Sequence, residues 1–174
     1  MINLIKKLPW HSSRNWGKRN RYSINKIIVH QSLSNSTTAG VNNYHIHPNH
    51  ISSRGLPHIA YHYAIERDGT TQWCNLLTEI LAHTRGQNSK AVGIMLNGHF
   101  SGEGYDKGIQ EPTDKQLKSL RQLLDHLIDF ELVDVGLTKK DVYGHHDFGK
   151  PACPGVTVSR FLDTYKNTKR EIVT

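Results

Sequence analysis

Short apolar runs rich in β-branched and aromatic residues alternate with polar stretches along the chain and predict a set of strands. The runs are residues 26–30 (KIIVH), 59–65 (IAYHYAI), 70–73 (TTQW), 91–96 (AVGIML) and 142–143 (VY). Asp68 and Gly69 form a dipeptide typical of hairpin turns and lead into the third run. The first run is expected to be buried and to present His30 at its C-terminal end.

The clearest helix is predicted after Thr113, which is placed to cap it, with Gln116 three residues on as in a capping box. Apolar residues then recur at helical spacing at Leu117, Leu120, Leu123, Leu124, Leu127 and Ile128. That stripe is expected to face the core. A closing helix is predicted over residues 156–165. Strands separated by helices favour an α/β fold, with a single domain built on a central mixed β-sheet flanked by α-helices.

Three polar segments complete the pattern. Residues 37–57 are interrupted by Pro48 and predict a short helix or turn followed by loop. Residues 98–108 (GHFSGEGYDKG) predict a glycine-rich loop. Residues 1–25 are rich in Lys, Arg, Asn and Ser and predict a basic N-terminal arm packed on a catalytic domain of residues 26–174, with Trp10 and Trp16 as anchors.

Composition limits the function classes. The 174 residues suit one domain with a real core, and 36% hydrophobic residues exclude a disordered chain. No apolar run approaches a membrane span, and the N-terminus lacks the apolar segment of a secretory signal. Two cysteines make no disulfide framework. A formal net charge of +7 favours an anionic partner such as nucleic acid, a membrane surface or a wall polymer, without choosing among them. The alternative for any one basic cluster is a solvated surface without a partner.

The stretch YGHHDFGKPACPG, residues 143–155, carries the strongest chemical signal. With His30 at a strand end, His145 and Cys153 would supply two imidazoles and a thiolate, a ligand set that Zn²⁺ takes in catalytic sites with one position left open. Ligands eight residues apart require a loop around the ion, which Gly149 and the prolines suit. The alternative is structural, since a single cysteine is usually a small core residue.

Four motifs in order, IIVHQS, AYHYAIERDG, AHTRGQNSKAVGIMLNG and GHHDFGKPACPG, resemble the type-2 N-acetylmuramoyl-L-alanine amidases, which include phage lysozyme-amidases and peptidoglycan-recognition proteins. The resemblance covers about residues 26–166. It implies Zn²⁺ ligation by His30, His145 and Cys153. It also implies that Tyr61 assists proton transfer and that His83 lies on the substrate side of the cleft.

The resemblance fails at one position. Phage members carry a catalytic lysine two residues before the cysteine, and here Pro151 stands there, with Lys150 one place further back. Lys150 is a candidate for the same catalytic role. The alternative is a solvated surface cation, which is the commoner fate of lysine.

Several histidines need separate interpretation. Tyr61 and His62 should point to opposite faces of a strand, so that one faces the site and the other packs; His62 is kept as a candidate substrate contact. His146 is not expected to be a ligand, and Asp147 is expected to hold the loop or a ligand imidazole. A cluster at His45, His47, His50 and His58 favours a cleft wall or solvated surface over a second metal site. Cys74 is expected in the core.

The expected function is a zinc-dependent hydrolase that cleaves the amide bond between N-acetylmuramic acid and L-alanine in bacterial peptidoglycan. Without a signal peptide, a phage or prophage endolysin is expected, held in the host cytoplasm and acting on the wall after release. A monomer without stable membrane association is expected. Two alternatives stay open: a non-catalytic peptidoglycan-binding protein, and an amidase whose arm contacts a polymerase or nucleic acid.

Overall fold

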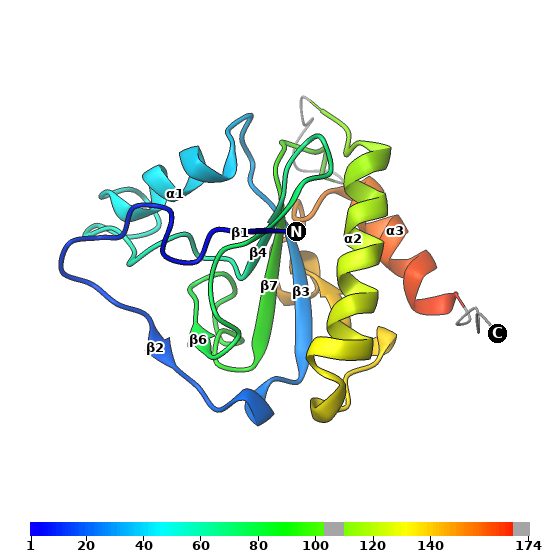
Figure 1. The fold of residues 1–174 in the computed structure, drawn as a ribbon. Helices are drawn as coiled ribbons and strands as arrows, with labels where there is room; N and C mark the ends of the chain where they lie inside the picture. The colour runs from blue at the N-terminus through cyan, green and yellow to red at the C-terminus, as the bar shows by residue number, and fades with distance from the viewer. Residues whose placement is uncertain (103–109, 169–174) are drawn as a thin grey trace.

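The central feature of the computed structural model, which describes residues 1–102 and 110–168, is a six-stranded sheet in the order β1-β5-β4-β7-β3-β8 (Figure 1). Its strands are β1 (Ile2–Asn3), β3 (Lys26–Gln31), β4 (Tyr63–Ile65), β5 (Thr71–Trp73), β7 (Ala91–Leu96) and β8 (Val142–Gly144). A separate antiparallel pair joins β2 (Gly17–Lys18) to β6 (Glu79–Ile80). Residues 103–108 of the predicted glycine-rich loop lie outside the described residues.

The sheet is mixed, as predicted. Strands β4, β7, β3 and β8 run parallel, whereas β5 returns antiparallel to β4 through the Asp68-Gly69 turn. Gly69 has a φ of +88°, a left-handed conformation that glycine adopts without steric cost. Because the connections between parallel strands must cross over the sheet, the carboxyl ends of β3, β7 and β8 meet at one edge.

Helices cover both faces of the sheet. α2 (Asp114–His126) and α3 (Val156–Asn167) lie together on one face, and α1 (Thr38–Ile46) lies on the other (Figure 1). Short helical turns connect these elements: η1 (Arg21–Ser23), η2 (Leu127–Glu131), η3 (Val133–Val135), η4 (Lys139–Asp141) and η5 (His145–Phe148). In the described part of the chain, no helix combines the length and the apolar character that crossing a membrane requires.

The helix predicted after Thr113 forms α2 with its full capping box, in which Thr113 Oγ1 accepts from the Gln116 N–H and the Gln116 side chain accepts from the Thr113 N–H. The apolar stripe packs in the main core, where Leu120, Leu124 and Leu127 are completely buried. α2 continues through the π-helical turn η2, which brings Ile128 into the same core. These predictions are therefore confirmed, and the closing helix is confirmed as α3.

The strand predicted at residues 59–65 is wrong in its first half, because β4 begins only at Tyr63. The backbone before it bonds to side chains of α1. The Ile59 N–H donates to Asn42 Oδ1 at 2.8 Å and the Ala60 N–H donates to His45 Nδ1 at 3.1 Å. Since these donors are already satisfied, the chain here packs against α1 and does not extend the sheet.

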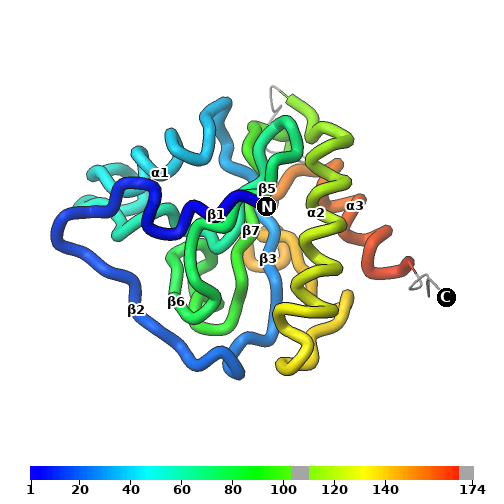
Figure 2. The backbone as a smooth tube through the Cα atoms, in the orientation of Figure 1, coloured from blue at the N-terminus to red at the C-terminus, as the bar shows by residue number. Residues whose placement is uncertain are grey.

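Residues 1–25 run along the α1 side of the sheet and are held at several points (Figure 2). β1 pairs with β5 at the sheet edge, and β2 pairs with β6. Between them, the Pro9 carbonyl accepts from Asn42 Nδ2 at 2.9 Å, and Trp10 stacks on His58 with ring centroids 4.6 Å apart.

Candidate metal centre

Strand β3 presents successive side chains to opposite faces of the sheet. Ile27 and Val29 join the core beneath α2, so His30 points to the other face, at the carboxyl edge of the sheet. The His30 side chain is 1% exposed. A polar ring buried to this degree requires partners for both nitrogens.

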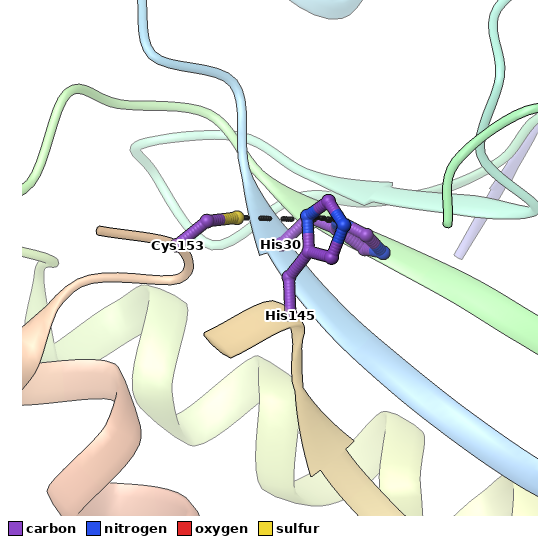
Figure 3. Close-up of side chains that lie close together, drawn as sticks. All are labelled: His30, His145 and Cys153. Carbon is purple, nitrogen blue, oxygen red and sulfur yellow. Dashed lines mark hydrogen bonds between the residues drawn. The ribbon is translucent and has the colours of Figure 1, made fainter. Parts of the chain in front are cut away.

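His145 and Cys153 meet His30 at this edge (Figure 3). His145 opens η5 directly after β8, and Cys153 lies in the loop before α3. Nδ1 of His30 lies 3.0 Å from Nδ1 of His145 and 3.9 Å from Sγ of Cys153. One donor atom from each residue falls within 4.8 Å of the other two, and no other such group of three occurs in the described residues.

Gln31, for which the sequence predicted no role, holds the loop that carries Cys153 in place through hydrogen bonds. Its side-chain Nε2 donates to the Ala152 carbonyl at 2.7 Å and to the Phe100 carbonyl at 3.2 Å. Its backbone N–H donates to Cys153 Sγ at 3.4 Å. Two neighbouring residues of β3 therefore have different roles: His30 contributes a donor atom to the centre, and Gln31 fixes the position of the Cys153 thiol.

His83 lies behind His30 and determines which His30 nitrogen is free. His83 Nε2 lies 3.4 Å from the Ala91 carbonyl, which can only accept, so Nε2 carries the proton. His83 Nδ1 is then an acceptor, 3.0 Å from the Thr84 hydroxyl and 3.1 Å from His30 Nε2, so that the Nε2–H tautomer of His30 can donate to it. His30 is left with its Nδ1 lone pair facing His145 and Cys153. A Cβ on Gly93 would meet the His83 ring at 2.8 Å, so this glycine makes room for the pair.

Burial sets the protonation of the three donors. Burial first, and then the neighbouring His83 and His145, hold the pKa of His30 well below its usual range. Burial lowers the pKa of His145 to about 4, with Lys150 and His146 acting in the same direction. Burial raises the pKa of the Cys153 thiol to about 12, against the opposing effects of the Gln31 N–H and Lys150. Both imidazoles are therefore neutral at pH 7, the form in which they donate a lone pair.

Tyr61 and Lys150, the two candidate catalytic residues, are placed differently. The Tyr61 ring lies 5.2 Å from the His30 ring between centroids, and its hydroxyl makes no hydrogen bond to another described residue. Burial, and then Cys153, raise the pKa of Tyr61 above its usual range. Lys150 is exposed, yet its charge lowers the pKa of both His145 and Cys153. Its ammonium group therefore acts electrostatically on two of the three donors.

The two candidate substrate contacts are enclosed within the protein. His83 is 6% exposed and has both ring nitrogens engaged, as described above. His62 is completely buried: its Nδ1 accepts from the Gly93 N–H at 3.0 Å, and its Nε2 lies 3.2 Å from both the Glu79 carbonyl and Arg19 Nη2. Arg19 itself donates to three backbone carbonyls. Contact of His62 and His83 with substrate stays a prediction.

The remaining histidines fall outside the centre. His146 turns away toward α3, with its Nδ1 3.2 Å from Ser159 Oγ. Asp147 holds the loop by accepting from the Gly144 N–H at 3.0 Å, as predicted. In the histidine cluster, His45 and His58 are buried, whereas His47 and His50 are exposed. Cys74, as expected, is buried in a small core cluster beside α1.

Comparison with known proteins agrees with this geometry. The model of the family described as N-acetylmuramoyl-L-alanine amidase matches residues 19–156. The endolysin of Klebsiella phage KP32 is 30% identical over 158 residues, which cover 88% of this chain and 92% of that protein. The endolysin of Escherichia phage T7 is 29% identical over 161 residues, covering 90% and 93%.

The solved structure of the endolysin amidase LysCS from Clostridium intestinale has the same fold. It aligns with a TM-score of 0.72 at 23% identity, and the alignment covers 97% of this chain and 95% of that one. The region matched by the family model extends from Arg19, which packs behind His62, to just beyond Cys153 and so includes the whole centre. The chain therefore belongs to the N-acetylmuramoyl-L-alanine amidase family.

Proposed function

We propose that this protein is a zinc-dependent endolysin that hydrolyses the amide bond between N-acetylmuramic acid and L-alanine in peptidoglycan. The observation that carries the proposal is the convergence of His30, His145 and Cys153 on one point, in a chain that the amidase family matches over residues 19–156. Hydrolysis breaks the lactyl C–N bond. It leaves a carboxylate on the muramic acid and frees the amino group of L-alanine on the stem peptide.

The three donors fit Zn²⁺. Tetrahedral zinc with Zn–N near 2.05 Å and Zn–S near 2.3 Å requires N···N of about 3.3 Å and N···S of about 3.6 Å. The observed distances of 3.0 Å and 3.9 Å from His30 Nδ1 lie within a few tenths of an ångström of these values. Two neutral imidazoles and one thiol, which loses its proton on binding, also match the preference of zinc for nitrogen and sulfur ligands.

The chain's own residues supply the rest of the chemistry. Zn²⁺ in such a site polarises a carbonyl and lowers the pKa of water from about 16 toward about 7. Tyr61 stays protonated at neutral pH, so its hydroxyl is suited to donate a hydrogen bond to the negative charge that develops on the amide oxygen. Lys150 is exposed, and its positive charge acts on His145 and Cys153.

Product analysis tests the proposal. Purified peptidoglycan incubated with the protein should release stem peptides with a free N-terminal L-alanine, identified by mass spectrometry. A chelator should stop the release, and added Zn²⁺ should restore it. Cleavage between sugars or within the stem peptide would contradict the proposal. Wall that is bound but chemically unchanged would favour the alternative of a non-catalytic recognition protein.

His83 is also expected to affect the zinc affinity, because it contacts the His30 nitrogen that faces away from the other donors. Replacing His83 with alanine removes the acceptor that holds His30 Nε2–H, so the zinc affinity should fall about 10- to 100-fold. Competition against a chromophoric chelator measures this directly. The exposed His47 provides the matched control, since His47→Ala should leave the affinity within about twofold. Equal zinc affinity in His83→Ala and the unmodified protein would show that His83 does not position His30.

The relatives support the proposed partner and place of action. A peptidoglycan-recognition protein with the same fold, PGRP-LE, was solved with monomeric diaminopimelic acid-type peptidoglycan, at 20% identity and a TM-score of 0.72. The similarity to phage endolysins supports action on the cell wall. We also propose that the protein is a monomer that accumulates in the host cytoplasm and reaches the wall after membrane lesion. Its positive charge should speed the approach to an anionic wall, and added salt should weaken that effect.

A further inference from the structure

The positive charge of the chain is concentrated in its first part. Residues 1–65 contain eight Lys and Arg residues and no Asp or Glu, whereas residues 66–174 contain 14 basic and 15 acidic residues. The whole formal excess therefore lies within residues 1–65, and all but one of these eight basic residues lie within residues 1–26. A segment of this length without a single carboxylate favours contact with an anionic partner.

A groove of about 490 Å³ is lined by residues of the N-terminal segment and of the chain around β6. Its apolar lining is formed by Trp10 and Trp16 together with Ile5 and Leu76. Lys6 and Lys18 are exposed on it, and neither ammonium group pairs with another described residue. The remaining lining residues are Asn15 and Glu79. The Glu79 carboxylate already accepts a hydrogen bond from the Leu76 N–H at 2.9 Å.

Two features of the residues that line this groove are energetically unfavourable for the protein by itself. The indole N–H groups of Trp10 and Trp16 are enclosed without an acceptor in the described structure. A buried donor without a partner is unfavourable, and a phenylalanine at either position would avoid that cost. Lys6 also has a φ of +59°, a left-handed conformation that is unfavourable for a residue with a side chain.

The walls of the groove are fixed. Its N-terminal wall is tied to the domain by the β1–β5 and β2–β6 pairings and by Arg19, whose guanidinium donates to the Leu77, Asn88 and Ala91 carbonyls. A groove with fixed walls loses little conformational entropy when a ligand binds. The same Arg19 lies 3.2 Å from His62 Nε2, which connects this wall to the residues behind the metal centre.

We propose that this groove is a second binding site for the peptide-free glycan strand of the wall. The inference rests on the proposed function, because amide hydrolysis leaves a free lactyl carboxylate on each muramic acid. Sugar rings present apolar C–H faces that pack on indole rings, and the carboxylates recur only at every second sugar. Two unpaired lysines on an aromatic groove suit such sparse charge better than a nucleic acid, which carries a phosphate at every nucleotide. The site would hold the enzyme on wall that it has already stripped.

The test uses glycan oligosaccharides freed of peptides by an unrelated amidase, which contain no bond that this enzyme cleaves. Titration of the full-length protein, followed by tryptophan fluorescence, should show saturable binding that weakens with salt. Neutral N-acetylglucosamine oligomers of the same length should bind at least tenfold more weakly. The double substitution Lys6→Glu, Lys18→Glu should weaken glycan binding at least tenfold. Its control is Lys7→Glu, Lys118→Glu, which changes the net charge equally at exposed lysines outside the groove.

Other outcomes would overturn the proposal. Equal weakening by both double substitutions would show a general charge effect, and tighter binding of a single-stranded oligonucleotide than of the glycan would show a nucleic-acid site. Cys153→Ser should keep the glycan affinity within about twofold, since a loss would place binding in the catalytic cleft. The amidase proposal is tested by a different measurement, the product analysis. Glycan binding without stem-peptide release would therefore contradict the proposed activity and still support the groove as a glycan-binding site.

Discussion

Replacing Cys153 with alanine is expected to lower the rate of stem-peptide release by at least about 10³-fold, which corresponds to about 4 kcal/mol of transition-state stabilisation. Cys153 supplies the only sulfur among the three converging donors, and Gln31 fixes its position through two contacts with the loop. Without the thiolate, two imidazoles are left to hold the ion. Release of L-alanine-terminated peptides measures the activity, and competition with a chelator measures the accompanying loss of zinc affinity.

The chain contains its own control for this substitution. Cys74 is the other free cysteine and is also buried, but it packs beside α1 and lies outside the metal centre. Cys74→Ala should cost some stability through the small cavity it leaves, while peptide release and zinc affinity stay close to those of the unmodified protein. Normal lysis by Cys153→Ala would end the proposed mechanism. Equal loss in both variants would point to a folding defect instead.

Replacing Tyr61 with phenylalanine is expected to lower kcat about 10²- to 10³-fold while zinc affinity stays unchanged. The ring itself remains, so its packing against His30 and His45 is kept, with centroids 5.2 Å and 5.9 Å away. Only the hydroxyl is lost. Because burial keeps that hydroxyl protonated at neutral pH, its loss removes a hydrogen-bond donor and not a base.

Tyr63 provides the comparison. It lies two residues further along the chain, is also buried, and packs in the main core, where its ring stacks on Trp73. Tyr63→Phe should therefore leave kcat within about twofold. Steady-state kinetics on a soluble muramoyl peptide separates kcat from KM for both variants. An unchanged kcat in Tyr61→Phe would assign the tyrosine a packing role alone.

The sequence was sufficient for the elements whose pattern is local. The capping box at Thr113, the apolar stripe of α2 and the β-branched runs of β3 and β7 each depend on neighbouring residues, and each prediction is confirmed. The first half of the run at 59–65 was misjudged, because its backbone bonds to Asn42 and His45, which are distant in sequence. Tertiary hydrogen bonding overrode a good local strand pattern.

The candidate centre was likewise predicted only in part from the sequence. The motif around His145 and Cys153 predicted a ligand set, and the structure brings both residues to His30. The supporting contacts of Gln31 and His83 were not foreseen, since only the three-dimensional arrangement shows which nitrogen of His30 is free. The motif alone also does not decide whether Lys150 takes the role of the family's catalytic lysine. Lys150 remains a candidate because its charge reaches His145 and Cys153, whereas its sequence position argues against it.

His30 and Cys153 are separated by 123 residues, and the parallel strands β3, β7 and β8 must register before the two approach each other. The three donors therefore come together only once the sheet that carries them has formed. The geometry of the centre depends on long-range folding as much as on the local motif around Cys153.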